Sequence, residues 1–137
     1  MKLIMCGFFL AFFVATGLSQ GHVWTVDIIV SAPDPVAAAA TTRALEKEIG
    51  SLHNARLTKT NEEMRVIVQM WPIEIEGANA HAFAASEIFV ERARCEPFPG
   101  GFIILGSSVN VIGGSDQITP FAQHVLEKMK ELVNEPK

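Results

Sequence analysis

Histidine and acidic side chains lie close together in this chain where a hairpin is predicted, and such groups can bind a metal ion. Glu74, Glu76 and His81 flank a predicted turn at residues 77–80. If that turn holds four residues, Glu76 faces His81 and Glu74 faces Phe83 across the hairpin. Carboxylates and an imidazole are ligands for zinc or copper. The spacing therefore predicts a candidate metal site, with solvated surface charges as the plainer interpretation.

His22 offers a second route to metal binding, which depends on where the N-terminus is processed. Cleavage after Ser19 would leave Gln20-Gly21-His22, whose amine, backbone nitrogens and imidazole bind Cu(II) in a square plane. Cleavage after Gly21 would instead place His22 at the terminus, as in the copper histidine brace of polysaccharide monooxygenases. The other interpretation is that His22 merely opens the first strand. We expect no cofactor, with copper or zinc as the alternative.

A loop rich in proline and glycine, residues 93–101, carries a further set of candidates. A connection of this length between two strands is more typical of a functional segment than of a simple link. Arg94, Cys95 and Phe98 are therefore candidates for contact with a partner. A thiol-dependent enzyme that uses Cys95 is a further alternative, because Arg92 and Arg94 favour a thiolate. No base that would activate the thiol is identifiable in the sequence.

The first 20 residues have the pattern of a secretory signal peptide. Lys2 precedes an apolar run over residues 3–14, and small residues follow at positions 15, 17 and 19. We expect cleavage between residues 17 and 21, leaving one domain over residues 21–137. The apolar run is shorter than the roughly 20 residues that span a bilayer, and the mature chain has no other such segment. The prediction is a secreted or periplasmic protein that keeps one cysteine, Cys95.

Composition limits the remaining classes of function. The chain has 137 residues, 49% of them apolar, and a formal net charge of −4. Its mean hydropathy is +0.27. Without the signal the apolar share falls to about 45%, an ordinary value for a globular domain. Binding to nucleic acid is not expected, because Asp and Glu outnumber Lys and Arg and no basic patch is present.

Hydrophobic periodicity predicts a two-layer α+β sandwich. Strands are expected over residues 22–30, 64–76, 81–92 and 102–112, with a short edge strand at 55–59 and a bulge at Pro72. Helices are expected over residues 35–49, capped by Asp34, and from near residue 116 or 119 to 134. The order β-α-(β)-β-β-β-α predicts a mainly antiparallel sheet of four to five strands, with two helices on one face.

The apolar residues of these strands alternate on both faces, although two helices can cover only one face. Trp71 and Ile67 are opposite in phase to Val66 and Val68. Apolar surface therefore remains for a protein partner or for association between copies of the chain. A twisted sheet that hides this surface is the alternative. Trp71 joins the candidate partner-binding residues.

The element order resembles, at the level of fold alone, small periplasmic modules such as the N-terminal domain of TolB and CsgG-like envelope proteins. This resemblance implies a role in the cell envelope and carries over no site residue. The sequence contains no P-loop, nucleophile elbow or zinc-protease motif. The leading hypothesis is therefore a non-catalytic module that binds another protein, ahead of a metal-binding protein or a thiol enzyme.

Overall fold

The chain folds into a five-stranded sheet with two helices packed on one side of it. The computed structural model describes residues 21–93 and 101–134, so the expected signal peptide and Arg94, Cys95 and Phe98 lie outside the described residues. The elements are, in order, β1 (Trp24–Ser31), α1 (Pro35–Gly50), β2 (Ala55–Leu57), β3 (Met64–Ile75), β4 (Ala78–Arg92), β5 (Phe102–Ile112), the short 3₁₀ helix η1 (Ser115–Gln117) and α2 (Ile118–Asn134). This is the predicted order.

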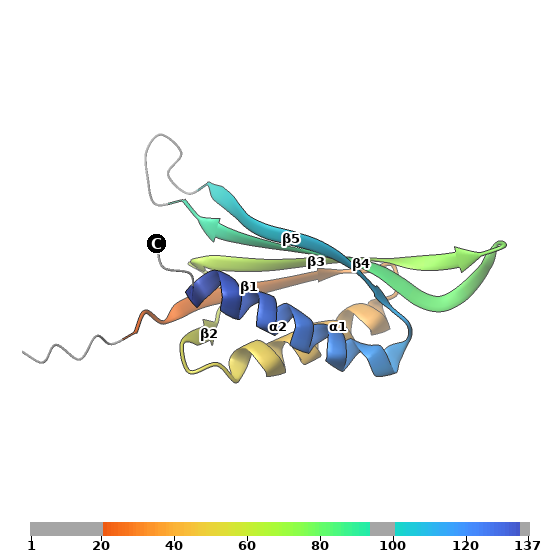
Figure 1. Cartoon of the computed structure of the whole chain (residues 1–137), viewed down its shortest axis with the longest axis horizontal. Helices are drawn as coiled ribbons and strands as arrows, with labels where there is room; N and C mark the ends of the chain where they lie inside the picture. The colour runs from red at the N-terminus through yellow and green to blue at the C-terminus, as the bar shows by residue number, and fades with distance from the viewer. Residues whose placement is uncertain (1–20, 94–100, 135–137) are drawn as a thin grey trace, which may run out of the picture.

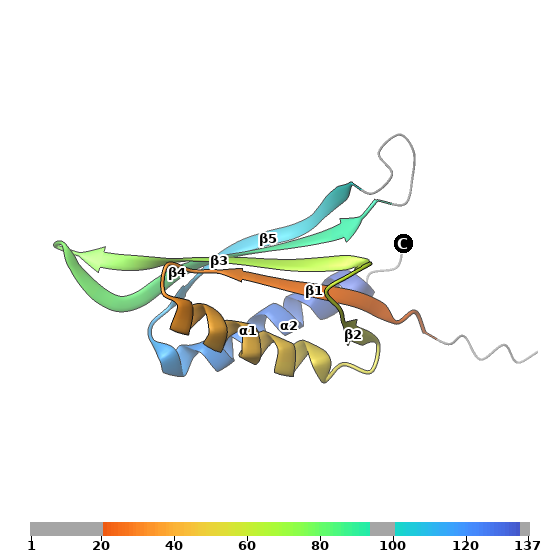
Figure 2. The same cartoon turned by 180° about the vertical axis from the view of Figure 1, so that it is seen from behind.

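The strands lie in the order β2-β1-β3-β4-β5. β1 runs parallel to both β2 and β3, whereas β3, β4 and β5 form an antiparallel meander. Figures 1 and 2 show α1 and α2 on the same face of the sheet. The predicted two-layer α+β fold is confirmed. The parallel pairs arise because the chain crosses over through α1 before it rejoins the sheet.

The core fills the layer between the sheet and the helices. Alternate residues of the strands point into it, among them Val26 on β1 and Val66 and Val68 on β3, all fully buried. Leu45 from α1 and Val125 from α2 meet them and are also fully buried. Among the described residues, no helix is long and apolar enough to cross a membrane.

Asp34 caps the N-terminus of α1, as the sequence predicts. Its Oδ1 accepts a hydrogen bond of 2.8 Å from the backbone N–H of Val36, and Pro35 occupies the first helical position. We expect Asp34→Ala to lower the free energy of unfolding by about 1 kcal/mol, since the first turn then keeps an unpaired N–H. Asp34→Asn is the matched control and should stay near the wild type, because asparagine caps equally well. Urea denaturation measures both, and equal losses would contradict the capping role.

The tip of the β3–β4 hairpin differs from the prediction. Its turn consists of Glu76 and Gly77, whose φ values of 51° and 78° are those of a two-residue type I′ turn. Ile75 therefore pairs with Ala78, and Glu74 pairs with Asn79. The predicted four-residue turn over residues 77–80 is wrong, because the Glu-Gly pair itself accepts the two left-handed positions.

Below the tip, the register of the hairpin shifts between Pro72 and Glu74, where the sequence predicts a bulge. The place of the bulge is confirmed, but the extra residues belong to the partner strand. Only Ile73 lies between the paired residues of β3, whereas residues 80–82 lie between those of β4. His81, in the middle of these three, has a φ of 54°. The bulge thus turns His81 out of the ladder rather than toward Glu76.

Candidate functional site

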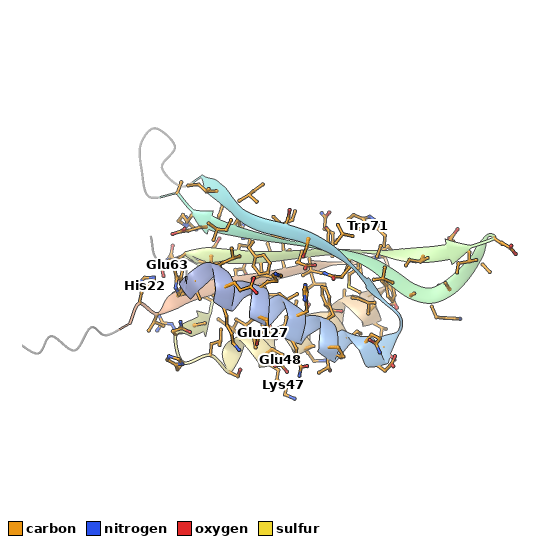
Figure 3. All side chains as sticks on the ribbon, viewed as in Figure 1. His22, Lys47, Glu48, Glu63, Trp71 and Glu127 are labelled. Atoms are coloured by element: carbon orange, nitrogen blue, oxygen red, sulfur yellow. The ribbon has the colours of Figure 1, made fainter. Side chains whose placement is uncertain are left out.

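The sheet face away from the helices, here called the open face, carries exposed apolar side chains. Trp71 on β3 is 48% exposed. Figure 3 shows it on the side of the sheet opposite α1 and α2. In the ladder Trp71 pairs with Ala84, which pairs with Val111, so a small residue separates two large ones. The exposed apolar members of this region, here called the apolar end, are Ile29, Trp71, Val109 and Val111.

The other end of the open face is charged, and its acidic and basic side chains contact one another. Asp27 lies 3.6 Å from the Nε of Arg65 and 3.5 Å from the Nζ of Lys59. Glu62 contacts Arg65 and lies 3.3 Å from the Nη2 of Arg92. The five side chains come from β1, β3, β4 and the segment between β2 and β3. Asp27 is on the open face of β1, yet it is only 7% exposed among its cationic neighbours.

Phe102 on β5 packs against both guanidinium groups of this charged end. The Cζ of Arg65 lies 4.6 Å from the centroid of its ring, and that of Arg92 lies 5.4 Å away. Stacking on an aromatic face holds a planar guanidinium in place. The charged end therefore links the start of β3, the end of β4 and the start of β5 into one rigid corner.

The carboxyl of Glu62 has a shifted pKa. A hydrogen bond that its carboxylate accepts from the backbone of Glu62 itself, together with the charges of Arg65 and Arg92, holds the pKa of the carboxyl below the ordinary value. Burial opposes this shift, and the side chain of Glu62 is almost fully enclosed. The pKa of Glu62 is lowered on balance, which favours the charged carboxylate that contacts the two arginines.

A second polar cluster lies on the helix side of the sheet, around one buried carboxylate. Glu87 on β4 has an exposed fraction of 0%. The Nδ2 of Asn110 donates to both of its carboxyl oxygens, at 2.8 and 3.0 Å, and Ser108 donates to Oε1. The Nε2 of His124, from α2, lies 3.4 Å from the same oxygen. This cluster ties β4, β5 and α2 together.

Sequence reasoning missed Glu87 and Glu62. A signal for Glu87 exists in the alternation of β4, where it stands between Ala85 and Phe89 at a position that faces the core. Glu62 has no such signal, because it lies outside any strand and its burial comes from residues distant in sequence. His124 on α2 was likewise not connected with Glu87 by the sequence, although its Nε2 lies 3.4 Å from the Oε1 of Glu87.

The residues predicted as metal ligands do not come together. Glu74, Glu76 and His81 are exposed, and the observed register does not place Glu76 opposite His81. The Nε2 of His22 lies 3.1 Å from the Oε2 of Glu63, and its ring packs edge-on against Trp24. Figure 3 labels His22 and Glu63 side by side. Within the described ranges, no three His, Cys, Asp or Glu side chains are placed to hold a metal ion. Copper or zinc binding at His22 stays a prediction.

Comparison with known proteins gives only remote likenesses. No family model and no curated protein matches the chain. Among solved structures, the PelC dodecamer from Paraburkholderia phytofirmans is similar with a TM-score of 0.47 at 8% identity, over 85% of this chain and 90% of that chain. Protein XCC0632 from Xanthomonas campestris has a TM-score of 0.41 at 10% identity, over 82% and 83%. Both TM-scores lie below 0.5 and carry no argument about function.

Proposed function

We propose that this chain is a non-catalytic, exported module that binds another protein through the apolar end of its open face. The observation that carries the proposal is the one-sided packing of the sheet. Both helices cover the same face, while Trp71, Val109 and Val111 stay exposed on the other. Contiguous exposed apolar surface on a small domain is typical of a protein-binding site.

The arrangement of charges supports a protein partner with an apolar surface. Arg65 and Arg92 are already engaged by Glu62 and Phe102. The charged end therefore has no pair of free guanidiniums to offer to a phosphate or nucleic acid, among the residues that the structure describes. The apolar end contains no charged side chain at all, so burying it removes no ion from water.

Trp71 is the expected centre of the contact. Tryptophan is enriched among the residues that dominate binding energy, since its large flat ring buries much apolar area. Val111 lies two strands away across Ala84, which leaves room for a partner side chain between the two. We therefore expect Trp71 to contribute most of the binding energy, and the surrounding valines to contribute less.

The test uses a photo-crosslinking benzoylphenylalanine at position 71 of the full chain, in the cells that naturally produce it. The matched control places the same residue at Val36, which is 72% exposed on α1, away from the open face. We expect position 71 to give an adduct of discrete mass that position 36 does not give. The protein identified in that adduct is then purified and titrated with the wild type and with Trp71→Ala.

Loss of a central tryptophan should weaken binding of the identified protein at least about tenfold, whereas Val36→Ala should leave the affinity unchanged. Equal adducts from positions 71 and 36 would overturn the proposal. So would an unchanged affinity of Trp71→Ala for the crosslinked protein.

A further inference from the structure

The outer edge of β5 lacks the charged residues, the proline and the short length that commonly protect a strand edge. Its one irregularity is a bulge at Leu105, between Ile104, which pairs with Val90, and Gly106, which pairs with Phe89. Its 11 residues, Phe102–Ile112, include no charged residue and no proline. Ile104, Val109 and Val111 on it are about 70% exposed. Among the described residues, β5 pairs only with β4. Long, uncharged apolar edges pair readily with another strand, and proteins usually block them with lysine, proline or short length.

The unpaired backbone groups of this edge belong to identifiable residues. The N–H of Ala93 donates to the carbonyl of Gly101 at 2.7 Å, and that of Arg92 donates to the carbonyl of Glu63 at 2.8 Å. Because backbone groups alternate along an antiparallel strand, odd-numbered residues of β4 bond to β5. Their partners on β5 beyond the bulge are residues 108, 110 and 112. The backbone groups of Ser107, Val109 and Val111 therefore point outward.

The opposite edge of the sheet is protected. β2 is only three residues long, and Thr58 continues its ladder by donating to the carbonyl of Val26. Lys59 then donates to the carbonyl of Ile28 at 3.3 Å and lies 3.8 Å from Glu46. A lysine bound to the edge and a short outer strand both prevent further pairing. The β2 edge of the sheet is therefore protected by Lys59 and by the short length of β2, whereas the β5 edge has neither kind of protection.

The surface beside the middle of β5 is complementary to itself. Ser107 is the central residue of the strand, and Lys128 and Glu131 of α2 line a hollow of about 310 Å³ together with Gly106–Ser108. Lys128 and Glu131 lie 3.0 Å apart as an exposed ion pair. A two-fold axis beside Ser107 would place two copies of α2 antiparallel. Lys128 of each copy would then approach Glu131 of the other, so opposite charges meet.

We propose that two copies of this chain pair antiparallel through the outer edges of β5, which joins their sheets into one of ten strands. We infer that a second copy of this chain binds this edge, because its β5 is equally long and uncharged. In an antiparallel pair, Lys128 of one copy would also face Glu131 of the other. Backbone hydrogen bonds supply the contact, as in other cases of strand addition. This dimer leaves Trp71 on β3 exposed, whereas Val109 and Val111 on β5 belong both to the pairing edge and to the apolar end.

Sedimentation velocity of the full purified chain over a range of concentrations tests the pairing. We expect a reversible dimer. Lys128→Glu should weaken dimerisation at least about tenfold, because four acidic side chains then meet at the axis. The double variant Lys128→Glu/Glu131→Lys should restore it.

Val109→Pro should also give a monomer, since it removes an outward N–H without breaking the ladder to β4. Circular dichroism confirms that each variant is folded.

Two control variants separate this edge from other contacts. Val36→Lys adds a charge at a site as exposed as Val109 and should leave the dimer intact. Trp71→Ala alters the open face and should leave it intact as well. A wild-type chain that stays monomeric at millimolar concentration overturns the pairing. Dissociation by Trp71→Ala without an effect of Lys128→Glu also overturns it, because the copies would then meet through the open face.

Discussion

Replacing Glu87 by methionine should lower the free energy of unfolding by about 3 kcal/mol. Methionine matches the length of the side chain and keeps the core filled, so little of the loss comes from a cavity. The loss arises because the half-buried side chains of Ser108 and Asn110 then lose the carboxylate that accepts their hydrogen bonds. Each unsatisfied buried donor costs about 1 to 3 kcal/mol.

Glu87→Gln is the informative companion variant. Its amide keeps one acceptor oxygen, but its nitrogen meets the donating Nδ2 of Asn110, which now bonds to both carboxyl oxygens. We therefore expect a loss of about 1 to 2 kcal/mol, smaller than that of Glu87→Met. Urea denaturation followed by circular dichroism measures both variants.

A double-mutant cycle shows whether the effect belongs to the cluster. Asn110→Ala should cost much less in a chain that already carries Glu87→Met than in the wild type, because its acceptor is gone. Glu127→Gln, on the exposed side of α2 in Figure 3, is the control and should stay within about 0.5 kcal/mol of the wild type. Additive losses in the cycle would contradict the proposed contacts of Glu87.

Glu62→Gln should lower the free energy of unfolding by about 2 kcal/mol at pH 7. Glu62 is 3% exposed and engages Arg65 and Arg92 through its two carboxyl oxygens. The amide of glutamine carries no charge and presents N–H donors to the guanidiniums, which are themselves donors. The substitution is destabilising because Arg92 loses this carboxylate, while Arg65 keeps only the more distant carboxylate of Asp27 among the contacts described above.

The same substitution should change how stability depends on pH. The folded pKa of Glu62 lies below its ordinary value of 4.5. Its contribution is therefore fully present above about pH 4.5 and is lost as the pH falls through the depressed folded pKa. In Glu62→Gln the loss of stability on acidification from pH 5 should be smaller than in the wild type. Urea midpoints between pH 3 and 7 measure this difference.

Glu74→Gln is the matched control for this titration, because Glu74 is exposed near the hairpin tip. Its stability should follow the wild type at every pH. If Glu62→Gln and the wild type lose stability in parallel below pH 5, Glu62 does not hold the two arginines as described.

Local patterns predicted most of the fold. The alternation of Val66 and Val68 depends only on the period of a strand, and it selects the buried face of β3. Asp34 followed by Pro35 starts α1 through contacts within three residues. Both signals are short-range, so the chain specifies them before any distant segment is placed. The mixed direction of the sheet follows from the crossover through α1.

The hairpin tip was harder to predict because two turns compete over the same few residues. Glu76-Gly77 and residues 77–80 each resemble a turn, and the difference changes which side chains face one another. The two-residue turn at Glu76-Gly77 leaves extra residues on β4, and these form a bulge in which His81 has a left-handed conformation. Register depends on the sum of pairings along both strands, which no single window of the sequence contains.

The sequence by itself determined the order of the main elements, the inward faces of the strands and the presence of apolar residues on both faces. Only the tertiary structure decided that Asp27, Glu62 and Glu87 are enclosed, that Trp71 stays exposed and that β5 has an open edge. Periodicity arises from bonds between near neighbours in the chain. Burial and edges depend on which distant segments pack together, and that is a property of the assembled layers.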